Sequence, residues 1–337
     1  MLRLLLFPFS IIYDLITRIR NHLYNIGHKS SFRFDVPVIS VGNLNAGGSG
    51  KTPMIEYIIC LLSANHRVAT LSRGYKRRTK GFRIANSNDN ATTIGDEPYQ
   101  MFLKFGKNIV VTVGEDRAYA IPNILQEDDE IEAILLDDAF QHRAVDPSFS
   151  ILLTEYGRPF TRDYVLPAGN LRESRKGASR ADVIVVTKCP SRKLNIDALT
   201  NDIRKYAGNK PVFFTTLKYR DLVSFGDLSS PSGKVILVTG IANPDPLYTH
   251  IKQHFEILKH FRYSDHHSFT ESDVNEIHFE AQQISDVCIV TTEKDMARLR
   301  SIPSVPRHPW FYIPIEVEFL KNGSEFDTLV ARQLKRD

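Results

Sequence analysis

The sequence predicts an α/β fold of the P-loop NTPase type, in which a mostly parallel sheet is flanked by helices. Short β-rich runs alternate with helical stretches along the chain, which is typical of such a sheet. Between residues 36 and 62, a strand, a glycine-rich turn and a helix start follow one another, as a phosphate-binding loop requires. Polar residues follow several β-rich runs, at the sheet edge where folds of this class bind ligands.

Composition favours a soluble globular protein over a nucleic-acid-binding one. The chain has 337 residues, enough for one large or two modest domains. Its net charge of +4 is spread along the chain apart from short clusters, which argues against a nucleic-acid partner. The cysteines at positions 60, 189 and 288 are odd in number and far apart, so we expect thiols in a reducing compartment.

The first segment, residues 1–27, is expected to form an amphipathic helix at a membrane interface. Residues 4–13 are apolar and uncharged, but a membrane-spanning helix needs roughly 20 such residues. At helical spacing one face is apolar, formed by Ile12, Leu15, Ile16, Ile19, Leu23 and Ile26. The polar residues lie away from this stripe. The alternative is that the helix packs on the domain through the same stripe.

The phosphate-binding loop is expected between a strand at 36–41 and a helix at 54–62. The pattern G-x-x-x-x-G-K-[ST] requires glycine where this chain has Asn45, a residue that tolerates left-handed geometry. Lys51 would reach the β- and γ-phosphates, and Thr52 would contact Mg²⁺. The nucleotide-binding backbone comprises Asn45, Gly47, Gly48, Ser49, Gly50, Lys51 and Thr52. The alternative is an ordinary glycine-rich turn.

Further β-rich runs define a core at residues 28–215 and a smaller C-terminal α/β lobe at 216–330. In the core they lie at 67–72, 109–113, 131–137, 149–153, 183–187 and 212–215. Two more follow at 235–239 and 287–292, with a helical pattern at 270–284. The best loop signal between the two lobes is the serine-rich stretch 229–233.

Two acidic pairs are candidate site residues. The buried-strand pattern at 133–138 ends in Asp137 and Asp138, where a P-loop protein holds the aspartate that organises Mg²⁺. Asp96 and Glu97 precede a helical pattern, so Asp96 could be an N-cap with Glu97 in the first turn. Alternatively, one of the two carboxylates is a proton acceptor and the other belongs to the Mg²⁺ shell.

Basic loops and a histidine pair complete the set. Arg73 and Arg172 lie in loops that follow strand-like runs, and arginine there suits phosphate contacts. His266 and His267 precede a helix start at residue 270, and either could orient a catalytic carboxylate. The sequence does not choose between them.

Six motifs, in this order, resemble the tetraacyldisaccharide 4'-kinase (lipid A 4'-kinase) family. They lie at 42–52, 72–75, 95–98, 137–142, 167–173 and 265–267, and the resemblance extends from the N-terminal helix to about residue 300. It implies an ATP- and Mg²⁺-dependent kinase that phosphorylates the 4'-hydroxyl of a tetraacyldisaccharide 1-phosphate, an acylated glucosamine disaccharide and lipid A precursor, to form lipid IVA. It also implies a peripheral or monotopic protein at the cytoplasmic face of the inner membrane, which we expect to be monomeric.

The resemblance also implies roles for individual residues. Asp96 would be the base, supported by His266, while Lys51 and Arg172 would neutralise phosphate charge. Thr52, Glu97, Asp137 and Asp138 would arrange Mg²⁺. The residues implied in substrate binding are Arg73, Tyr75, Gln141, His142 and Asn170. Ala139 replaces the usual glycine of this motif, which the site should tolerate unless position 139 needs a positive φ.

Other functions fit parts of the sequence less well. The main alternative is a membrane-surface P-loop ATPase without a lipid acceptor, but partitioning-type ATPases place a second lysine where this chain has Asn45. A guanine-nucleotide switch needs an N/T-K-x-D motif, which the stretch at 187–190 lacks and the stretch at 292–295 mis-spaces. A nucleic-acid-binding role for the basic clusters at 76–78 and 172–176 lacks interleaved aromatic side chains.

Overall fold

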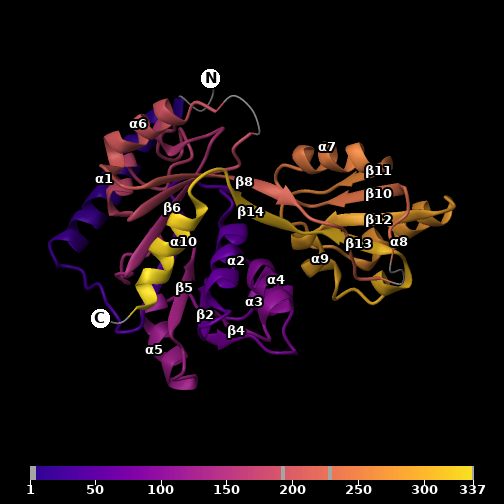
Figure 1. Ribbon diagram of the computed structural model, residues 1–337, viewed down its shortest axis with the longest axis horizontal. Coiled ribbons are helices and arrows are strands. Elements are labelled where there is room, and N and C mark those ends of the chain that lie inside the picture. Colours follow the sequence, from indigo (N-terminus) through magenta and orange to yellow (C-terminus); the bar gives the residue numbers. More distant parts are fainter. Residues whose placement is uncertain (1–4, 191–193, 227–229, 336–337) are drawn as a thin grey trace.

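The computed structural model describes residues 5–190, 194–226 and 230–335 of the chain. Residues 1–4 of the expected membrane segment and Ser229 of the expected loop lie outside these ranges. The described chain forms two lobes, each built on its own sheet, and they lie side by side along the long axis of the molecule (Figure 1). This arrangement confirms the predicted α/β class with a smaller second lobe.

The larger sheet has nine strands in the order β14-β8-β7-β6-β1-β5-β2-β4-β3. The edge strands β3 and β14 are antiparallel to their neighbours, and the strands between them are parallel. Its strands are β1 (Val38–Asn43), β2 (Val68–Ser72), β3 (Arg83–Ile84), β4 (Ile109–Val113), β5 (Ala133–Asp137), β6 (Phe149–Glu155), β7 (Val183–Thr187), β8 (Val212–Tyr219) and β14 (Ile315–Phe319).

Helices cover both faces of this sheet. Successive side chains of a strand point to opposite faces, and here apolar side chains on both faces pack against helices. On β1, Ile39 packs with α2 (Lys51–Leu62), α4 (Asp96–Phe105) and α10 (Gly323–Ala331). Its neighbour Val38 faces the opposite side and packs with α5 (Arg117–Glu127), and α6 (Ile196–Ala207) covers that side further along the sheet. The short helix α3 (Ala91–Ile94) precedes α4. These layers place the carboxyl ends of the parallel strands at one open edge.

The smaller lobe has five strands in the order β11-β10-β12-β13-β9. They are β9 (Val223–Ser224), β10 (Lys234–Thr239), β11 (Glu256–Arg262), β12 (Val287–Thr292) and β13 (Trp310–Ile313), with helices α7 (Asp245–His254), α8 (Glu271–Gln282) and α9 (Glu293–Leu299). The expected range 216–330 differs from this lobe at its end. Strand β14 pairs with β8, about a hundred positions away, and α10 packs on the larger sheet against residues that are still more distant in the sequence. Local sequence patterns do not encode such contacts.

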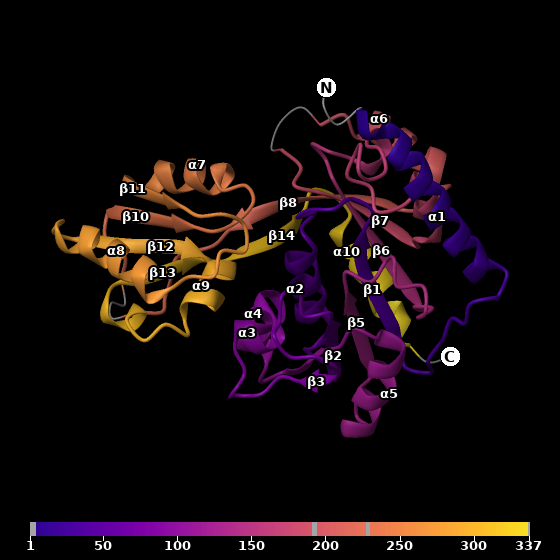
Figure 2. The same cartoon turned by 180° about the vertical axis from the view of Figure 1, so that it is seen from behind.

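The N-terminal helix α1 (Phe7–Asn25) lies along the outside of the larger lobe (Figure 2). Its apolar stripe points away from the protein, since Ile12, Leu15, Ile16 and Ile19 are each more than half exposed. The buried residues of α1 are the polar Ser10 and Thr17. The alternative that the stripe packs on the domain is therefore wrong. Among the described residues, no helix combines the length and apolar character needed to cross a membrane.

Candidate active site

The predicted phosphate-binding loop is present and has the expected geometry. Strand β1 ends at Asn43 and helix α2 begins at Lys51, with Gly50 as the N-cap. Gly50 has φ 82° and ψ 27°, a left-handed conformation that favours glycine. The end of β7 stabilises the loop, because Thr187 Oγ1 donates to the Ser49 carbonyl at 2.8 Å. The turn thus presents the N-terminus of α2 to an anion.

Asn45 was expected to replace the usual glycine because asparagine tolerates a left-handed backbone, but Asn45 does not have a positive φ. Among the described residues other than glycine, those with positive φ are Lys76, Asp138, Lys188, His266, Asp286 and Asn322. The Asn45 side chain instead donates from Nδ2 to Asp163 Oδ2 at 3.0 Å, and its backbone bridges to Leu171. Asn45 therefore joins the phosphate-binding loop to the 163–173 loop, a contact across more than a hundred residues.

Lys51 and Arg172 both approach Asp138, directly after β5. Lys51 Nζ lies 3.7 Å from Asp138 Oδ1, and Arg172 Nη1 donates to the same oxygen at 2.7 Å. Burial raises the pKa of Asp138, but the charges of Lys51 and Arg172 outweigh burial and lower it. Asp138 has φ 48°, whereas Ala139 has no positive φ. The substitution of alanine at 139 is thus compatible with the backbone.

Asp137 is a buried carboxylate with unused hydrogen-bonding capacity. It is 5% exposed, its Oδ2 accepts from Ser72 Oγ at 3.3 Å, and its Oδ1 has no hydrogen-bond partner among the described residues. Burial and the charges of Glu97 and Asp138 raise the pKa of Asp137 to about 7. The N-terminus of α4 lies close to the end of β5, because Gly95 packs against Gly74, two residues after the Ser72 that donates to Asp137.

This donor set fits a divalent cation that also binds phosphate. A cation beside Asp137 would offset the repulsion that raises its pKa and would occupy the orphaned oxygen. Within the described ranges, no three Asp, Glu, His or Cys side chains form a metal site by themselves. Mg²⁺ usually binds through one or two carboxylates and substrate phosphates, so the fit is to a nucleotide-bound ion.

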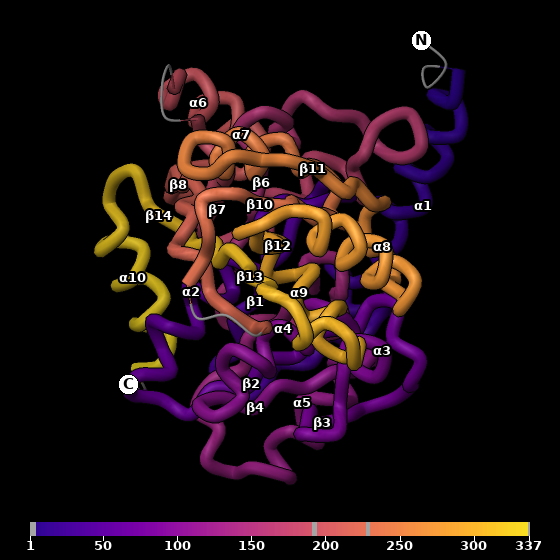
Figure 3. Tube along the Cα trace, turned by 90° about the vertical axis from the view of Figure 1, so that its right-hand side faces the viewer, coloured from indigo at the N-terminus to yellow at the C-terminus, as the bar shows by residue number. Residues whose placement is uncertain are grey.

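The second half of the site joins the two lobes. Asp96 is the first residue of α4, after the N-cap Gly95, so the prediction that Asp96 itself caps the helix is wrong. Asp96 Oδ2 lies 2.8 Å from His266 Nδ1, and Lys294 Nζ lies 3.3 Å from His266 Nε2. Lys294 Nζ also pairs with Glu97 Oε1 at 3.1 Å. Asp96 and Glu97 lie on α4 and Lys294 lies on α9, and these two helices lie side by side (Figure 3).

Asp96 is held ionised in spite of its burial. Burial raises its pKa, but the hydrogen bond with His266 and the charge of Lys294 outweigh that effect and lower the pKa to about 2. Lysine only donates, so His266 Nε2 accepts from Lys294 and the Nδ1 proton points to Asp96. The carboxylate is thus available to accept a proton or a hydrogen bond at its other oxygen.

The geometry separates the two candidate histidines. His267 Nε2 lies 3.0 Å from Asp273 Oδ2, within the capping box of α8, and does not contact Asp96. Tyr75 packs against His266 with 5.5 Å between ring centroids. The structure therefore brings His266, with Tyr75 against its ring, to the Asp96 carboxylate, whereas His267 bonds Asp273.

Two of the residues expected to bind substrate, Gln141 and Asn170, make hydrogen bonds within the protein. Gln141 Nε2 donates to the Asn43 carbonyl at 2.9 Å, and Asn170 Nδ2 donates to Asp163 Oδ2 at 3.1 Å. The Asn170 carbonyl also accepts from Ala46 N at 2.6 Å. Both side chains thereby support the phosphate-binding loop.

His142 and Arg73 are better placed to meet an anionic substrate. His142 Nε2 is buried without a hydrogen-bond partner in the described chain, and burial together with Arg117, Arg20 and Arg73 lowers the pKa of His142. Arg73 is exposed. Positive charge in this region comes from Arg73 and from the buried Arg117, whose Nη2 donates to the Asp137 carbonyl at 3.4 Å.

Sequence reasoning missed three residues of the site: Lys294, Arg117 and Glu173. The stretch 292–295, which contains Lys294, was used only to argue against a guanine-nucleotide switch. A lysine in the first turn of a helix that directly follows a strand could have indicated a site residue. Arg117 follows the N-cap Asp116, and Glu173 follows Arg172. Their roles depend on tertiary contacts.

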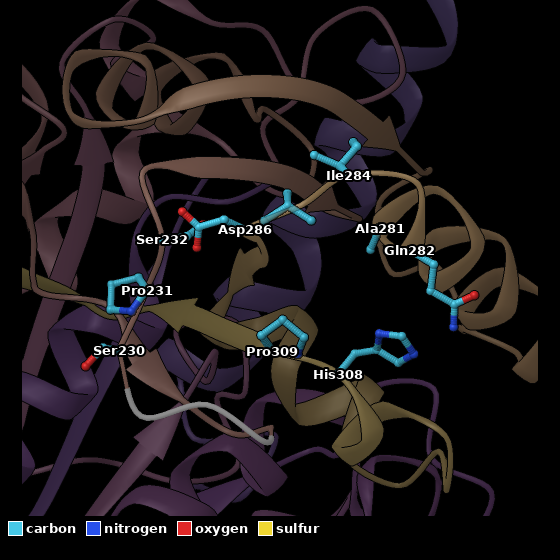
Figure 4. A pocket seen from close by; sticks show the side chains of 10 residues that line it. Ser230, Pro231, Ser232, Ala281, Gln282, Ile284, Asp286, His308 and Pro309 are labelled. Carbon is cyan, nitrogen blue, oxygen red and sulfur yellow. The ribbon is translucent and has the colours of Figure 1, made fainter.

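The pocket shown in Figure 4 is separate from this site. It has a volume of about 260 Å³ and lies where β10, β12 and β13 begin, whereas His266 and Lys294 lie beyond the ends of β10 and β12. Its lining residues are Ser230, Pro231, Ser232, Ala281, Gln282, Ile284, Asp286, Val287, His308 and Pro309. It therefore takes no part in the chemistry at Asp96.

A phosphate-binding loop, paired carboxylates at a neighbouring strand end and a carboxylate–histidine pair between two lobes define a P-loop phosphotransferase. Comparison with known proteins specifies which one. The family model described as Tetraacyldisaccharide-1-P 4'-kinase matches residues 2–335. The chain belongs to this family, which confirms the predicted ATP-dependent kinase class.

Individual relatives agree with this assignment. The chain is 42% identical over 347 residues to the tetraacyldisaccharide 4'-kinase of Flavobacterium johnsoniae, covering 100% of this chain and 98% of that one. It is 44% identical to the same enzyme of Flavobacterium psychrophilum, covering 99% and 97%. A crystal structure of LpxK from Aquifex aeolicus in complex with ATP matches with a TM-score of 0.78 and 29% identity, over 99% of this chain and 100% of that one.

Proposed function

We propose that this chain transfers the γ-phosphoryl group of ATP to the 4'-hydroxyl of a tetraacylated glucosamine disaccharide 1-phosphate, giving lipid IVA. The observation that carries the proposal is the placement of Asp96. Its carboxylate is ionised, is bonded on one side to His266, and begins the helix whose next residue, Glu97, acts on Asp137 beside the phosphate-binding loop. A hydroxyl group brought to this position would meet both a proton acceptor and the end of a triphosphate.

The chemical step needs little beyond positioning and charge neutralisation. A bond forms between the sugar oxygen and the γ-phosphorus, the bond to the bridging oxygen of ADP breaks, and the hydroxyl proton passes to Asp96. Lys51 and Arg172 neutralise phosphate charge, since both already approach Asp138 at the mouth of the loop. His266 and Lys294 keep Asp96 oriented.

Thr52, Glu97, Asp137 and Asp138 are the proposed ligands of Mg²⁺, directly or through water. When bound, the ion neutralises charge on the β- and γ-phosphates. The orphaned Oδ1 of Asp137 supports this assignment, because a buried carboxylate oxygen without a partner is costly unless a ligand completes it.

The acylated substrate explains the exposed stripe of α1. Each buried CH₂ group holds a lipid in the bilayer by about 0.8 kcal/mol, so a substrate with four acyl chains stays in the membrane. The enzyme must therefore come to the bilayer surface. The stripe of Ile12, Leu15, Ile16 and Ile19 provides apolar contact. The exposed Arg73 and the half-buried His142 are the proposed contacts of the anionic headgroup. We place the protein at the cytoplasmic face of the inner membrane, where it would act as a monomer.

The test is transfer of label from γ-labelled ATP to the disaccharide 1-phosphate in vesicles with Mg²⁺. Labelled lipid is expected with the substrate and not with its 4'-deoxy analogue. Hydrolysis of ATP without labelled lipid under every condition would overturn the proposal and favour the alternative, a membrane-surface ATPase without a lipid acceptor.

A further inference from the structure

The polar face of α1 is hydrogen-bonded to the loops of the active site. Asn21 Nδ2 donates to Glu173 Oε2 at 2.6 Å, and Arg20 Nη2 donates to the Gln141 carbonyl at 3.1 Å. Nearer the start of the helix, Ser10 Oγ accepts from the backbone N–H of Ala168 at 2.9 Å. A helix that served only to hold the protein at a membrane would not need these contacts.

Glu173 is the centre of this connection. The Glu173 side chain is fully buried. Its Oε1 accepts from Gln141 Nε2 at 3.1 Å and from Arg180 Nη2 at 2.7 Å, and its Oε2 accepts from Asn21 Nδ2. A buried carboxylate must keep such partners, because loss of any one leaves charge without compensation. Glu173 therefore fixes the positions of α1, of the loop that carries Gln141 and of the 3₁₀ helix that ends at Arg180 relative to one another.

The same contacts continue to the reacting groups. Gln141 Oε1 accepts from Arg172 Nη1 at 3.4 Å, and Arg172 Nη1 also donates to Asp138. Asp138 in turn pairs with Lys51. A continuous series of side-chain contacts thus leads from α1 through Glu173 to the phosphate-binding lysine.

We propose that Glu173 is a positioning residue that couples α1 to Arg172, so that α1 sets the geometry of phosphoryl transfer in addition to binding lipid. This inference rests on the proposed function of the same site. It predicts that breaking the contact between Asn21 and Glu173 slows transfer even where no membrane is involved. Asn21 faces the protein, so its replacement leaves the apolar stripe intact.

The first experiment uses Asn21→Leu in the full-length protein, with a water-soluble disaccharide 1-phosphate that lacks long acyl chains. We expect kcat to fall about tenfold, the loss that corresponds to one hydrogen bond to a buried charge, with the KM for ATP unchanged. Sedimentation with vesicles should be unchanged. His22→Leu, one position along on an exposed site, is the matched control and should retain the wild-type kcat.

The second experiment reverses the polarity of the bond. In the double variant Asn21→Asp with Glu173→Gln, the new amide can donate to the new carboxylate, while its carbonyl oxygen still accepts from Gln141 and Arg180. Each single variant should lose about tenfold in kcat, and the double variant should recover to within about threefold of wild type. Such recovery also shows that the single losses do not reflect misfolding.

Two results would overturn the inference: wild-type kcat in Asn21→Leu, or a double variant no faster than the slower single variant. Both are distinct from a failure of the proposed function, in which the wild-type protein itself would phosphorylate neither the soluble nor the acylated disaccharide.

Discussion

His266 Nδ1 lies 2.8 Å from Asp96 Oδ2, although 170 positions of sequence separate the two residues and each belongs to a different lobe. The contact forms because α9 and the 264–267 turn of the smaller lobe pack against the N-terminus of α4. Lys294 adds a second contact from the same lobe at 3.3 Å from His266 Nε2. The proposed base is therefore complete only when both lobes are in place.

The two histidines are predicted to differ sharply in their effect on catalysis. His266→Gln should lower kcat on the order of 10-fold to 100-fold, because it removes the ring that orients Asp96. A general base contributes roughly 10²–10⁴ to the rate, and the variant should lose part of that contribution. His267→Gln should keep kcat within about threefold, since His267 contacts Asp273 instead. Steady-state rates of both variants at saturating ATP give the comparison, and equal losses would contradict the assignment of His266.

Asp137 is predicted to govern the requirement for Mg²⁺. Asp137→Asn should raise the Mg²⁺ concentration for half-maximal rate at least about tenfold, since even outer partners of a metal commonly contribute that much. The variant should stay folded at neutral pH, because burial already disfavours the charge of Asp137. The exposed Asp129→Asn serves as a control. An unchanged Mg²⁺ dependence in Asp137→Asn would exclude this residue from the metal site.

Glu293 is predicted to make stability depend on pH. Burial and the charge of Glu56 raise its pKa from 4.5 to about 7, against the opposing effect of Lys104. A carboxyl group with a higher pKa in the folded state binds more protons there, so the folded protein loses stability as pH rises from about 4.5 to about 7.

Glu293→Gln should remove this loss. Its free energy of unfolding should exceed that of wild type by on the order of 2 kcal/mol near pH 8, with little difference near pH 5. Lys104 keeps Glu56 as a partner at 2.7 Å in the variant. Urea unfolding at the two pH values measures the effect. A variant that is less stable than wild type at both would show that the ion pair with Lys104 outweighs the burial of Glu293.

The apolar stripe of α1 is predicted to bind lipid. Replacing Ile12 and Ile16 together by serine should weaken binding to anionic vesicles at least about tenfold, because several buried methylene equivalents are lost at about 0.8 kcal/mol each. Both side chains are more than half exposed, so the melting temperature should not fall. Co-sedimentation with vesicles tests this, and undiminished binding would place the membrane contact elsewhere.

Local patterns in the sequence predicted the elements around the phosphate. The strand before the loop, the glycine-rich turn and the helix after it depend on local backbone conformation and on the pattern of buried residues, which neighbouring residues determine. The helix was expected at 54–62 and begins three residues earlier, at Lys51. The carboxylates at the end of β5 followed from the same reasoning. The helix with one apolar face near the N-terminus was also predicted from such a local pattern, and α1 confirms it.

Contacts between distant segments could not be predicted in this way. The pairing of Asp96 with His266 and Lys294 depends on how two lobes pack, and the choice of His266 over His267 depends on a turn in which His266 has φ 57°. Asn45 was expected to serve the loop through its backbone, but its side chain bonds Asp163 more than a hundred residues away. The return of β14 to the larger sheet has the same origin.

The central claim, that Asp96 accepts the proton of the lipid hydroxyl opposite a triphosphate bound at Lys51, is tested most directly by single-turnover transfer in Asp96→Asn. The account predicts that this variant binds ATP with wild-type affinity but transfers its γ-phosphate to the disaccharide roughly 10²–10⁴ times more slowly. Transfer at a near wild-type rate, with ATP bound normally, would contradict it.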